Sequence, residues 1–339
     1  DFCLSRGLGD VYKRQIYTSG TTGNPKGVRR VMGTGSAQAM GQLARNVMGI
    51  TPGRVMRTVI TGPLYHSAPN FYGLYAVRDG GLAILQPRFE AEELLRFIEH
   101  YRITHLHMVP TMFVRLLRLP DAVKRRYDLS SLEWVVHAAA PCPAEIKRQM
   151  IEWWGPVIVE YYGATETGGV TFHTAEEALA RPGTVGRPLP GGVVRIYDAE
   201  GRVLPPGEVG EIYLWLEGWP DFTYHGLDEK RREMARDGLV SVGDVGYLDE
   251  DGYLFLCDRK RDMVISGGVN IYPAEIEAVL LAMPGVHDCA VFGIPDAEFG
   301  ETLCAYIEPE PQARLGQADV TTFLLSLIHI SEPTRQAEI

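Results

Sequence analysis

Two hydrophobic patterns alternate along residues 16–182. Short apolar segments that predict strands lie at 55–61, 82–85, 105–109, 132–138 and 157–162. Segments with apolar residues at helical spacing lie at 36–48, 90–101, 111–119 and 143–154. Strands that alternate with helices predict a parallel α/β sheet.

The pattern changes after Gly183. Short strands at 193–197, 211–216 and 252–257, separated by Gly and Pro turns, predict a small antiparallel barrel or sheet. A third pattern follows Asp258, with strands at 263–266, 286–294 and 303–308 and a helix at 273–282, which predicts a small α+β unit. We therefore expect an N-terminal domain at 16–260, divided into an α/β part (16–182) and a β-rich part (183–260), and a smaller C-terminal domain at 261–324.

The two ends, 1–15 and 325–339, are expected to be non-native tails. Residues 10–15 can be encoded by GAT GTG TAT AAG AGA CAG, and the reverse complement of that string translates into residues 325–330. One short DNA element flanking an insert in opposite orientations explains both ends. The alternative is a native N-terminal loop and a native C-terminal helix, but neither segment enters the predicted fold.

Composition and charge narrow the class of protein. The 339 residues include 33 Lys and Arg against 43 Asp and Glu, a net charge of −10. A net acidic surface argues against nucleic acid or an anionic membrane as partner, so a phosphate site must be built locally. No apolar run reaches the roughly 20 residues of a transmembrane segment. The five cysteines form no C-x-x-C pair and no secretory signal precedes them, which favours a reduced cytoplasmic protein.

The segment 18–27 is rich in small, hydroxyl-bearing residues. It is not a Walker A loop, because Pro25 stands where the second Gly is required and Gly27 follows Lys26. Its composition still suits a nucleotide triphosphate, since glycine lets backbone N–H groups approach phosphate oxygens and hydroxyls and one Lys add donors. The candidate phosphate-binding residues are Thr18, Ser19, Gly20, Thr21, Thr22, Gly23 and Lys26. The alternative for this segment is an ordinary turn.

Two further clusters could hold other parts of a nucleotide. Thr165 and Glu166 follow an apolar strand, where a carboxylate beside a hydroxyl can hold a Mg²⁺–phosphate complex, and Tyr162 offers a flat face for a base. Asp244 could accept both hydroxyls of a ribose, and Arg259 could serve the same sugar. The alternatives are a strand–turn with two polar residues and a charged hairpin pair.

Five segments together resemble one family. Residues 18–27, 161–166, 183–188, 243–246 and 258–273 are similar, in order, to the motifs of AMP-forming acyl-CoA synthetases. These belong to the adenylate-forming superfamily, which also contains peptide-synthetase adenylation domains and firefly luciferase. The resemblance implies an α/β fold, in which a large N-terminal domain of a parallel-sheet part and a β-barrel-like part precedes a small α+β domain.

The resemblance also implies an activity and its co-substrates. A carboxylic acid would attack the α-phosphate of ATP, with Mg²⁺ present, to give acyl-AMP and pyrophosphate, and the thiol of coenzyme A would then displace AMP. Because both reactants of the first step are anions, catalysis would rest on charge neutralisation and positioning.

Family roles transfer to matching positions of this sequence. The 18–26 segment would bind the β- and γ-phosphates, Thr165 the α-phosphate and Glu166 the Mg²⁺ ion. The adenine would lie between Tyr162, within the motif of Tyr161 and Gly163, and the segment of Ala139, Ala140 and Pro141. Asp244 and Arg259 would take the ribose.

The resemblance implies roles for three further sites. His66 matches an aromatic or histidine position near the acyl pocket. Arg261 matches the hinge about which the small domain rotates, where the family usually has Asp or Lys. The segment of Ser266, Gly267 and Gly268 would lie beside the pantetheine channel of coenzyme A. The family's N-terminal subdomain and its C-terminal catalytic lysine have no counterpart here, so the 339 residues alone are expected not to synthesise acyl-CoA.

Some alternatives stay open. The chain could load a carrier-protein thiol instead of coenzyme A, although residues 271–273 resemble acyl-CoA synthetases, or it could be a non-catalytic nucleotide-binding relative. A fatty, aromatic or bile-acid-like carboxylic acid would each fit the resemblance. The oligomeric state is not readable from the sequence.

Overall fold

The computed structural model describes residues 15–18, 26–266, 269–296, 299–310 and 312–328. The chain forms two compact units, one of Asp1–Val242 with Gly246–Leu256 and one of Gly243–Val245 with Cys257–Ile339. Each unit is described by itself below.

The centre of the first unit is a seven-stranded sheet in the order β4-β3-β5-β6-β7-β8-β9. Five neighbouring strands are parallel: β3 (Arg57–Ile60), β4 (Leu82–Leu85), β5 (His105–Met108), β6 (Trp134–His137) and β7 (Ile158–Ala164). Two antiparallel strands, β8 (Gly168–His173) and β9 (Arg187–Pro188), extend it. The predicted parallel α/β sheet is confirmed, and its predicted strands overlap these five.

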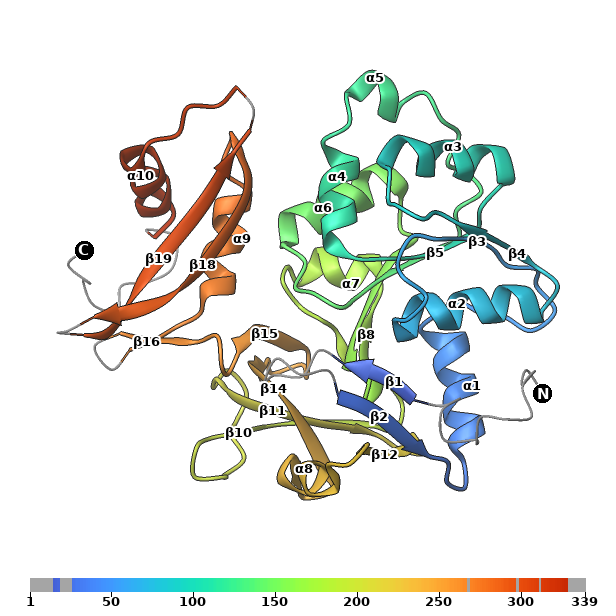
Figure 1. Ribbon diagram of the computed structural model, residues 1–339, viewed down its shortest axis with the longest axis horizontal. Coiled ribbons are helices and arrows are strands. Elements are labelled where there is room, and N and C mark those ends of the chain that lie inside the picture. Colours follow the sequence, from blue (N-terminus) through green and yellow to red (C-terminus); the bar gives the residue numbers. More distant parts are fainter. Residues whose placement is uncertain (1–14, 19–25, 267–268, 297–298, 311, 329–339) are drawn as a thin grey trace. The chain divides into compact units, whose positions relative to one another are not determined.

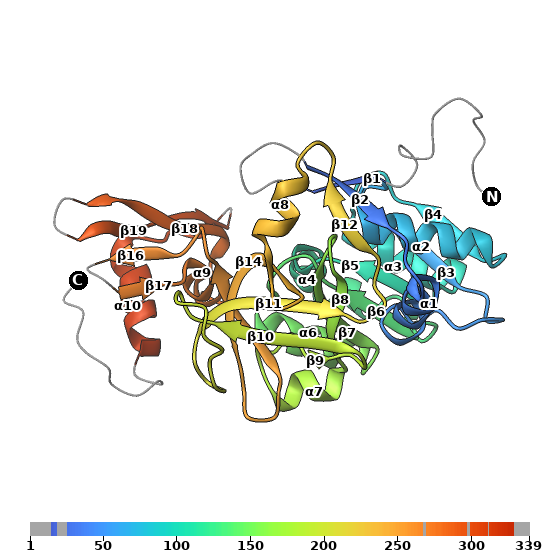
Figure 2. The same ribbon diagram turned by 90° about the horizontal axis from the view of Figure 1, so that it is seen from below.

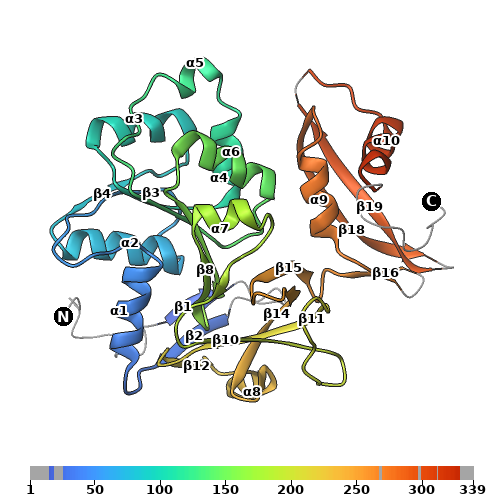
Figure 3. The ribbon, with the colours of Figure 1, turned by 180° about the vertical axis from the view of Figure 1, so that it is seen from behind.

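Alternating side chains of the strands pack into two separate hydrophobic cores, one on each face of this sheet. Val59, Val135 and Ile158 point into one cluster, whereas Ile60, Val136 and Val159, the next residues along, point into the other. The first cluster includes buried residues of α3 (Ala91–Tyr101), α4 (Pro110–Leu117), α6 (Ala144–Trp154) and α7 (Ala175–Ala180), whereas the short α5 (Asp121–Lys124) buries no side chain. The second packs against α1 (Ser36–Asn46) and α2 (Ser67–Arg78). Figures 1 and 3 show these two helix layers on opposite sides of the sheet.

A small antiparallel sheet joins distant parts of the first unit. It consists of β1 (Gln15–Thr18), β2 (Lys26–Val31) and β12 (Asp221–Tyr224), in that order. Figure 2 shows β12 running beside β2. Thr18 pairs with Lys26, so the two ends of the predicted phosphate-binding segment lie side by side, while Ser19 to Pro25 fall outside the described residues.

The β-rich part forms a five-stranded sheet. Its strands are β10 (Gly192–Tyr197), β11 (Gly210–Leu216), β14 (Leu239–Leu248) and β13 (Ala235–Arg236), with β15 (Leu254–Arg259) also paired to β14. The pairs β10–β11 and β13–β14 are antiparallel, as expected for this part, and α8 (Asp228–Glu233) precedes β13. Ile212, Leu214 and Leu216 join the same core cluster as α1 and α2.

The second unit is a four-stranded sheet with two helices, in agreement with the predicted α+β unit. The strand order is β17 (Val269–Ile271), β16 (Val264–Ser266), β19 (Gly300–Pro309) and β18 (Val286–Asp296), all antiparallel. The helix α9 (Pro273–Leu281) packs on β18, and α10 (Gln317–Ile328) follows.

The described residues include a small part of each predicted tail. Gln15 begins β1, and α10 continues from Leu325 to Ile328, while 1–14 and 329–339 lie outside the description. The non-native origin of these ends stays a prediction. Within the described part of the chain, no helix has the length and apolar character needed to cross a membrane.

Candidate functional site

One edge of the seven-stranded sheet gathers several predicted site residues. The carboxyl ends of parallel strands meet at a common edge, where α/β proteins bind ligands. His66 follows β3, Ala139, Ala140 and Pro141 follow β6, and Thr165 follows β7. His66 is exposed as the N-cap residue of α2, with its ring 4.7 Å from that of Tyr65. Its predicted role at an acyl pocket stays a prediction.

The turn after β6 carries backbone strain. Ala139 has a φ of 77°, in the left-handed region that a residue with a Cβ rarely adopts. Ala139, Ala140 and Pro141 are all exposed, so no buried side chain explains the conformation. Strained backbone of this kind costs about 1–3 kcal/mol and gathers at ligand sites. The predicted contact of this turn with a nucleotide base stays a prediction.

The Thr165–Glu166 pair lies in the tight connection between β7 and β8. A Cβ on Gly163 would lie 1.8 Å from the carbonyl oxygen of Gly168, so the two strands can approach only with glycine there. Inside the turn, the buried Thr167 hydroxyl accepts from the backbone N–H of Ala164 at 3.1 Å and donates to the carbonyl of Gly168 at 3.2 Å. The turn is therefore built to present Thr165 and Glu166 in one conformation.

Three residues from other elements hold this turn. Arg30 Nη2 donates to the carbonyl of Thr165 at 2.9 Å, and Trp219 Nε1 donates to the carbonyl of Glu166 at 3.2 Å. The Arg30 guanidinium lies over the Trp219 ring, 5.2 Å from its centroid. Burial lowers the pKa of Arg30, while the Glu166 carboxylate opposes that shift. The phenol of Tyr224 donates to Glu166 Oε1 at 2.7 Å.

Lys26 is placed close to the same group. Its ammonium lies 5.5 Å from the centroid of the Tyr224 ring, at the start of β2. Two sequence motifs that are far apart in the chain, the phosphate-binding segment and the Thr-Glu turn, thus meet around Tyr224. Thr18 is described only as a strand residue, and Ser19, Gly20, Thr21, Thr22 and Gly23 lie outside the described residues.

The two tyrosines of the motif differ in exposure. Tyr162, predicted to stack on adenine, is 9% exposed and belongs to the core cluster that includes Leu43 and Trp219. Tyr161 is half-buried, with its ring 6.2 Å from that of His107. Stacking on Tyr162 requires one face of its ring to be opened, and it stays a prediction.

A buried charge cluster lies behind the turn. The Lys147 ammonium of α6 contacts the Glu160 carboxylate of β7, His173 Nε2 of β8 at 3.0 Å and the carbonyl of Thr184 at 3.2 Å. Burial raises the pKa of Glu160, but Lys147 and the nearby histidines outweigh that effect and hold the pKa well below its usual range. His137 Nδ1 lies 3.7 Å from Glu160 Oε1, and burial lowers the pKa of His137 to about 3.

The predicted ribose pair lies within the second unit. Arg259 Nε lies 3.3 Å from Asp244 Oδ1, and Asp244 is largely buried while Arg259 is exposed. The structure thus brings these two predicted partners together as an ion pair. Whether they take a ribose stays a prediction.

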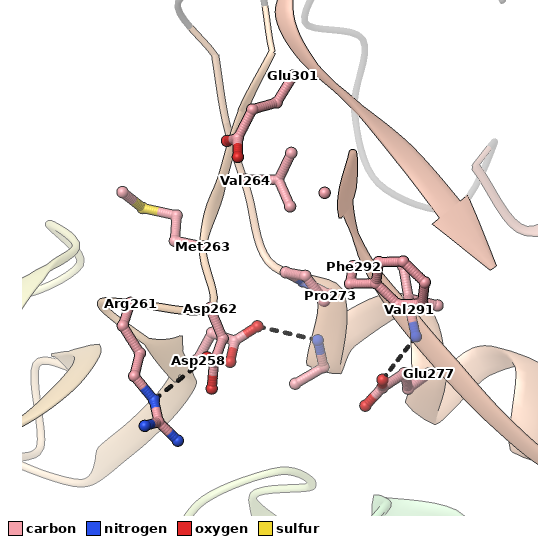
Figure 4. A pocket seen from close by; sticks show the side chains of 12 residues that line it. Asp258, Arg261, Asp262, Met263, Val264, Pro273, Glu277, Val291, Phe292 and Glu301 are labelled. Atoms are coloured by element: carbon pink, nitrogen blue, oxygen red, sulfur yellow. Dashed lines mark hydrogen bonds and ion pairs between the residues drawn. The ribbon is translucent and has the colours of Figure 1, made fainter. Parts of the chain in front are cut away.

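The predicted hinge residue Arg261 borders a pocket of about 340 Å³ in the second unit. Figure 4 shows its carboxylates, which come from Asp258, Asp262, Glu277 and Glu301. Arg261 Nε pairs with Asp262 Oδ1 at 3.2 Å, and Asp258 Oδ2 accepts from the N–H of Ala274 at the start of α9. Ser266 is half-buried at the end of β16, whereas Gly267 and Gly268 lie outside the described residues.

Two families of known proteins match this chain. Residues 15–218 match the AMP-binding enzymes, and residues 275–326 match the AMP-binding enzyme C-terminal domain. This chain belongs to the AMP-binding enzymes. The resemblance found in the sequence motifs is thereby confirmed.

Individual relatives of this AMP-binding enzyme match more than nine tenths of the chain. A feruloyl-CoA synthase of Amycolatopsis is 35% identical over 325 residues, which are 95% of this chain and 64% of that protein. The amide bond synthetase McbA of Marinactinospora thermotolerans superposes with a TM-score of 0.80 at 30% identity, over 94% of this chain and 63% of that one. ATP-bound MatB of Rhodopseudomonas palustris superposes with a TM-score of 0.79 at 31% identity, over 92% of this chain and 61% of that one. The chain spans less than two thirds of each of these proteins.

The Glu166 carboxylate of this AMP-binding enzyme suits a Mg²⁺ ion. Mg²⁺ is usually held by one or two carboxylates together with substrate phosphates and water. A carboxylate can accept at about four lone-pair positions, so the hydrogen bond from Tyr224 leaves capacity for a metal ion. In the described residues, no three or more His, Cys, Asp or Glu side chains are grouped to hold a metal ion by themselves.

The sequence motifs did not reveal the residues that hold the turn. Tyr224, Trp219 and Arg30 lie outside the five motif segments, and only the arginine pair at 29–30, close after the predicted segment, could have drawn attention. Lys147 also escaped notice, because a lysine within an amphipathic helix is normally a surface residue.

Proposed function

We propose that the complete protein is an ATP-dependent carboxylate–CoA ligase. It would activate a carboxylic acid as acyl-AMP with release of pyrophosphate, and then transfer the acyl group to the thiol of coenzyme A. The observation that carries the proposal is the meeting of Lys26, Tyr224 and Glu166, which joins a phosphate-binding segment to a carboxylate suited to Mg²⁺. The CoA-ligase relative and the ATP-bound relative support the same reaction class.

The residues act mainly by placing charge. Lys26 would bind the β- and γ-phosphates at the end of the segment that starts at Thr18, and Thr165 would contact the α-phosphate. Mg²⁺, bound at Glu166, would neutralise phosphate charge as pyrophosphate leaves. Because two anions must meet, positive charge preorganised in this way lowers the barrier of the first step more than any proton transfer would.

Other groups would bind the rest of the nucleotide and the thiol. Ala139, Ala140 and Pro141 form the exposed turn against which adenine would lie. Asp244 would accept the ribose hydroxyls, with Arg259 beside it. Arg261 would serve as the hinge, and Ser266 would border the channel for coenzyme A.

The acyl group is proposed only as a class. A feruloyl-CoA synthase is among the relatives, and this favours an aromatic carboxylic acid, with fatty and bile-acid-like acids as the other candidates. A panel of these acids, tested with coenzyme A and with a carrier-protein thiol as acceptors, would identify both substrates.

The deciding experiment replaces the proposed metal ligand. Glu166→Gln keeps the size of the side chain but removes the anionic oxygen that Mg²⁺ prefers. We expect acid-dependent pyrophosphate release by the complete protein to fall by about 100-fold or more, on the scale of losing one electrostatic contact in an active site. Glu177→Gln is the matched control. Glu177 lies outside the turn, and its Oε1 accepts a hydrogen bond from the Tyr253 phenol at the same distance, 2.7 Å. A Glu166→Gln protein with most of its rate at saturating Mg²⁺ would contradict the assignment.

A further inference from the structure

Tyr224 makes the contact that connects the two halves of the proposed phosphate site. Its hydroxyl donates to Glu166 Oε1 at 2.7 Å, although 58 residues separate the two in sequence. The side chain is 3% exposed, so this hydrogen bond is shielded from water.

The position of Tyr224 is fixed by the strand next to the phosphate segment. On β12, Tyr224 pairs with Val28 of β2, and the following residue, His225, donates its N–H to the carbonyl of Gly27 at 2.9 Å. Lys26 lies just before these residues on β2, and its ammonium lies over the Tyr224 ring. The same strand pairing therefore places Lys26 beside the ring whose hydroxyl contacts Glu166.

The backbone of the turn is held independently of this phenol. Trp219 Nε1 donates to the carbonyl of Glu166, and Arg30 Nη2 donates to that of Thr165. Removing the Tyr224 hydroxyl therefore leaves the turn in place and frees only the carboxylate. Hydrogen bonds to a metal-binding carboxylate orient it, and losing one typically costs 10- to 100-fold in metal affinity.

We propose that Tyr224 is a positioning residue that orients the Glu166 carboxylate for a divalent cation and couples it to Lys26. The proposal rests on the proposed function, since it takes Glu166 as the metal-binding group. In this proposal Tyr224 would act through the Glu166 carboxylate and not by binding the metal or the reacting atoms itself.

The test compares two phenol deletions in the complete protein. Tyr224→Phe removes the hydroxyl over Glu166, whereas Tyr253→Phe removes an equally short bond to Glu177 Oε1 from a side chain that is likewise buried, at 5% exposure. Binding of Mn²⁺, a hard cation that accepts the same oxygen ligands, is measured by its electron paramagnetic resonance signal in the presence of ATP. We expect the Mn²⁺ dissociation constant to rise about 10-fold or more for Tyr224→Phe and to stay within about two-fold of the parent for Tyr253→Phe.

The same titration separates positioning from folding damage. A protein that is partly unfolded binds fewer equivalents of Mn²⁺ with an unchanged dissociation constant, whereas a misoriented carboxylate binds the full equivalent more weakly. Pyrophosphate release by Tyr224→Phe should accordingly recover at high Mg²⁺. Equal dissociation constants for Tyr224→Phe and Tyr253→Phe would overturn the proposal.

A double substitution tests the coupling to Lys26. If the Tyr224 ring transmits the position of Lys26, the combined effect of Lys26→Met and Tyr224→Phe on Mn²⁺–ATP affinity should be smaller than the product of the single effects. Strictly multiplicative effects would remove the coupling from the proposal. If the parent protein binds no Mn²⁺–ATP, the proposed function is overturned as well. If Glu166→Gln loses Mn²⁺ affinity but Tyr224→Phe does not, the proposed function stands and only the role of Tyr224 is removed.

Discussion

Lys26 and Glu166 have opposite charges and both lie against Tyr224, yet they are expected to serve different parts of the reaction. Lys26 ends the segment proposed to bind the β- and γ-phosphates, which are present only in the first step. Glu166 is buried in the turn, where the hydroxyl of Tyr224 fixes one of its oxygens. The two residues can therefore be separated by measuring the half-reactions independently.

We predict that Lys26→Met slows the ATP-dependent half-reaction by about 10- to 1,000-fold, the range for loss of one preorganised charge contact. Thioester formation from synthetic acyl-AMP should change much less, because pyrophosphate is absent from that step. The two rates are measured by pyrophosphate release and by thiol consumption. Arg29→Met, at an exposed position three residues along the same strand, is the control. Equal losses in both halves would indicate that Lys26 has a structural role.

At the scale of elements, a buried ion cluster ties α6, β7 and β8 together. Lys147 comes from α6, Glu160 from the parallel strand β7 and His173 from the neighbouring antiparallel strand β8. All three side chains are buried. Because β7 leads directly into the Thr165–Glu166 turn, the cluster anchors the strand that carries the proposed metal ligand.

We predict that Lys147→Met lowers the free energy of unfolding by about 3–5 kcal/mol, because it leaves the Glu160 carboxylate buried without its cation. Arg148→Met is the control on the next residue of α6, because Arg148 contacts Glu145 and Glu152 at the surface and its loss should leave the free energy of unfolding nearly unchanged. Urea titrations followed by tryptophan fluorescence give both values. A further Glu160→Gln substitution should recover part of the loss in Lys147→Met. Indistinguishable midpoints for Lys147→Met and Arg148→Met would refute the anchoring role.

Local periodicity predicted those elements whose side chains divide cleanly between core and solvent. The strands of the parallel sheet and the helices α3 and α6 were predicted within a few residues. The helix α2 was not, because Pro69 and Gly73 are poor helix formers and apolar side chains such as Leu74 and Val77 are exposed beside its buried face. Strand β12 escaped prediction because its four residues acquire strand character only by pairing with β2, almost 200 positions earlier.

The candidate site was predicted to the same extent and for the same reason. Motif spacing identified Lys26, Thr165 and Glu166, and the ion pair of Asp244 and Arg259 joins two residues that were predicted to act together. Tyr224 and Arg30 contact the turn through tertiary packing. They lie 58 and 135 residues away in sequence from the residues that they contact, and no spacing rule covers such separations. Motifs thus point to the groups proposed to meet a ligand, whereas the fold reveals the groups that hold them in place.

At the scale of the whole molecule, the net charge of −10 and the buried histidines respond to pH in different ways. Surface charge changes gradually and is screened by salt. His107 and His137 are buried, and burial lowers their pKa values to about 4 and about 3, so the fold holds both rings neutral. In the unfolded chain each ring would bind a proton near its ordinary pKa of about 6.5.

Acidification should therefore destabilise the first unit well above the pKa values of its carboxylates. Between about pH 6.5 and pH 4 the unfolded chain binds more protons than the folded one, so stability falls as the pH falls. From pH 7 to pH 5 each of these two histidines should lower the free energy of unfolding by about 2 kcal/mol. This follows from 1.36 kcal/mol per pH unit over the roughly 1.5 units between the ordinary pKa of about 6.5 and pH 5. The depressed pKa of Glu160 acts in the same direction, but only below about pH 4.5, so it does not affect this window.

The test is a single substitution measured at two pH values. All five tryptophans lie in the first unit, so their fluorescence in urea reports its unfolding alone. We predict that His107→Gln, which removes the titrating ring, loses about 2 kcal/mol less stability between pH 7 and pH 5 than the parent does. His100→Gln, at an exposed position on α3, should lose as much as the parent. The same pH dependence in the His107→Gln protein as in the parent would show that His107 titrates alike in the folded and unfolded chain, and the neutral buried ring would then be ruled out as a source of acid sensitivity.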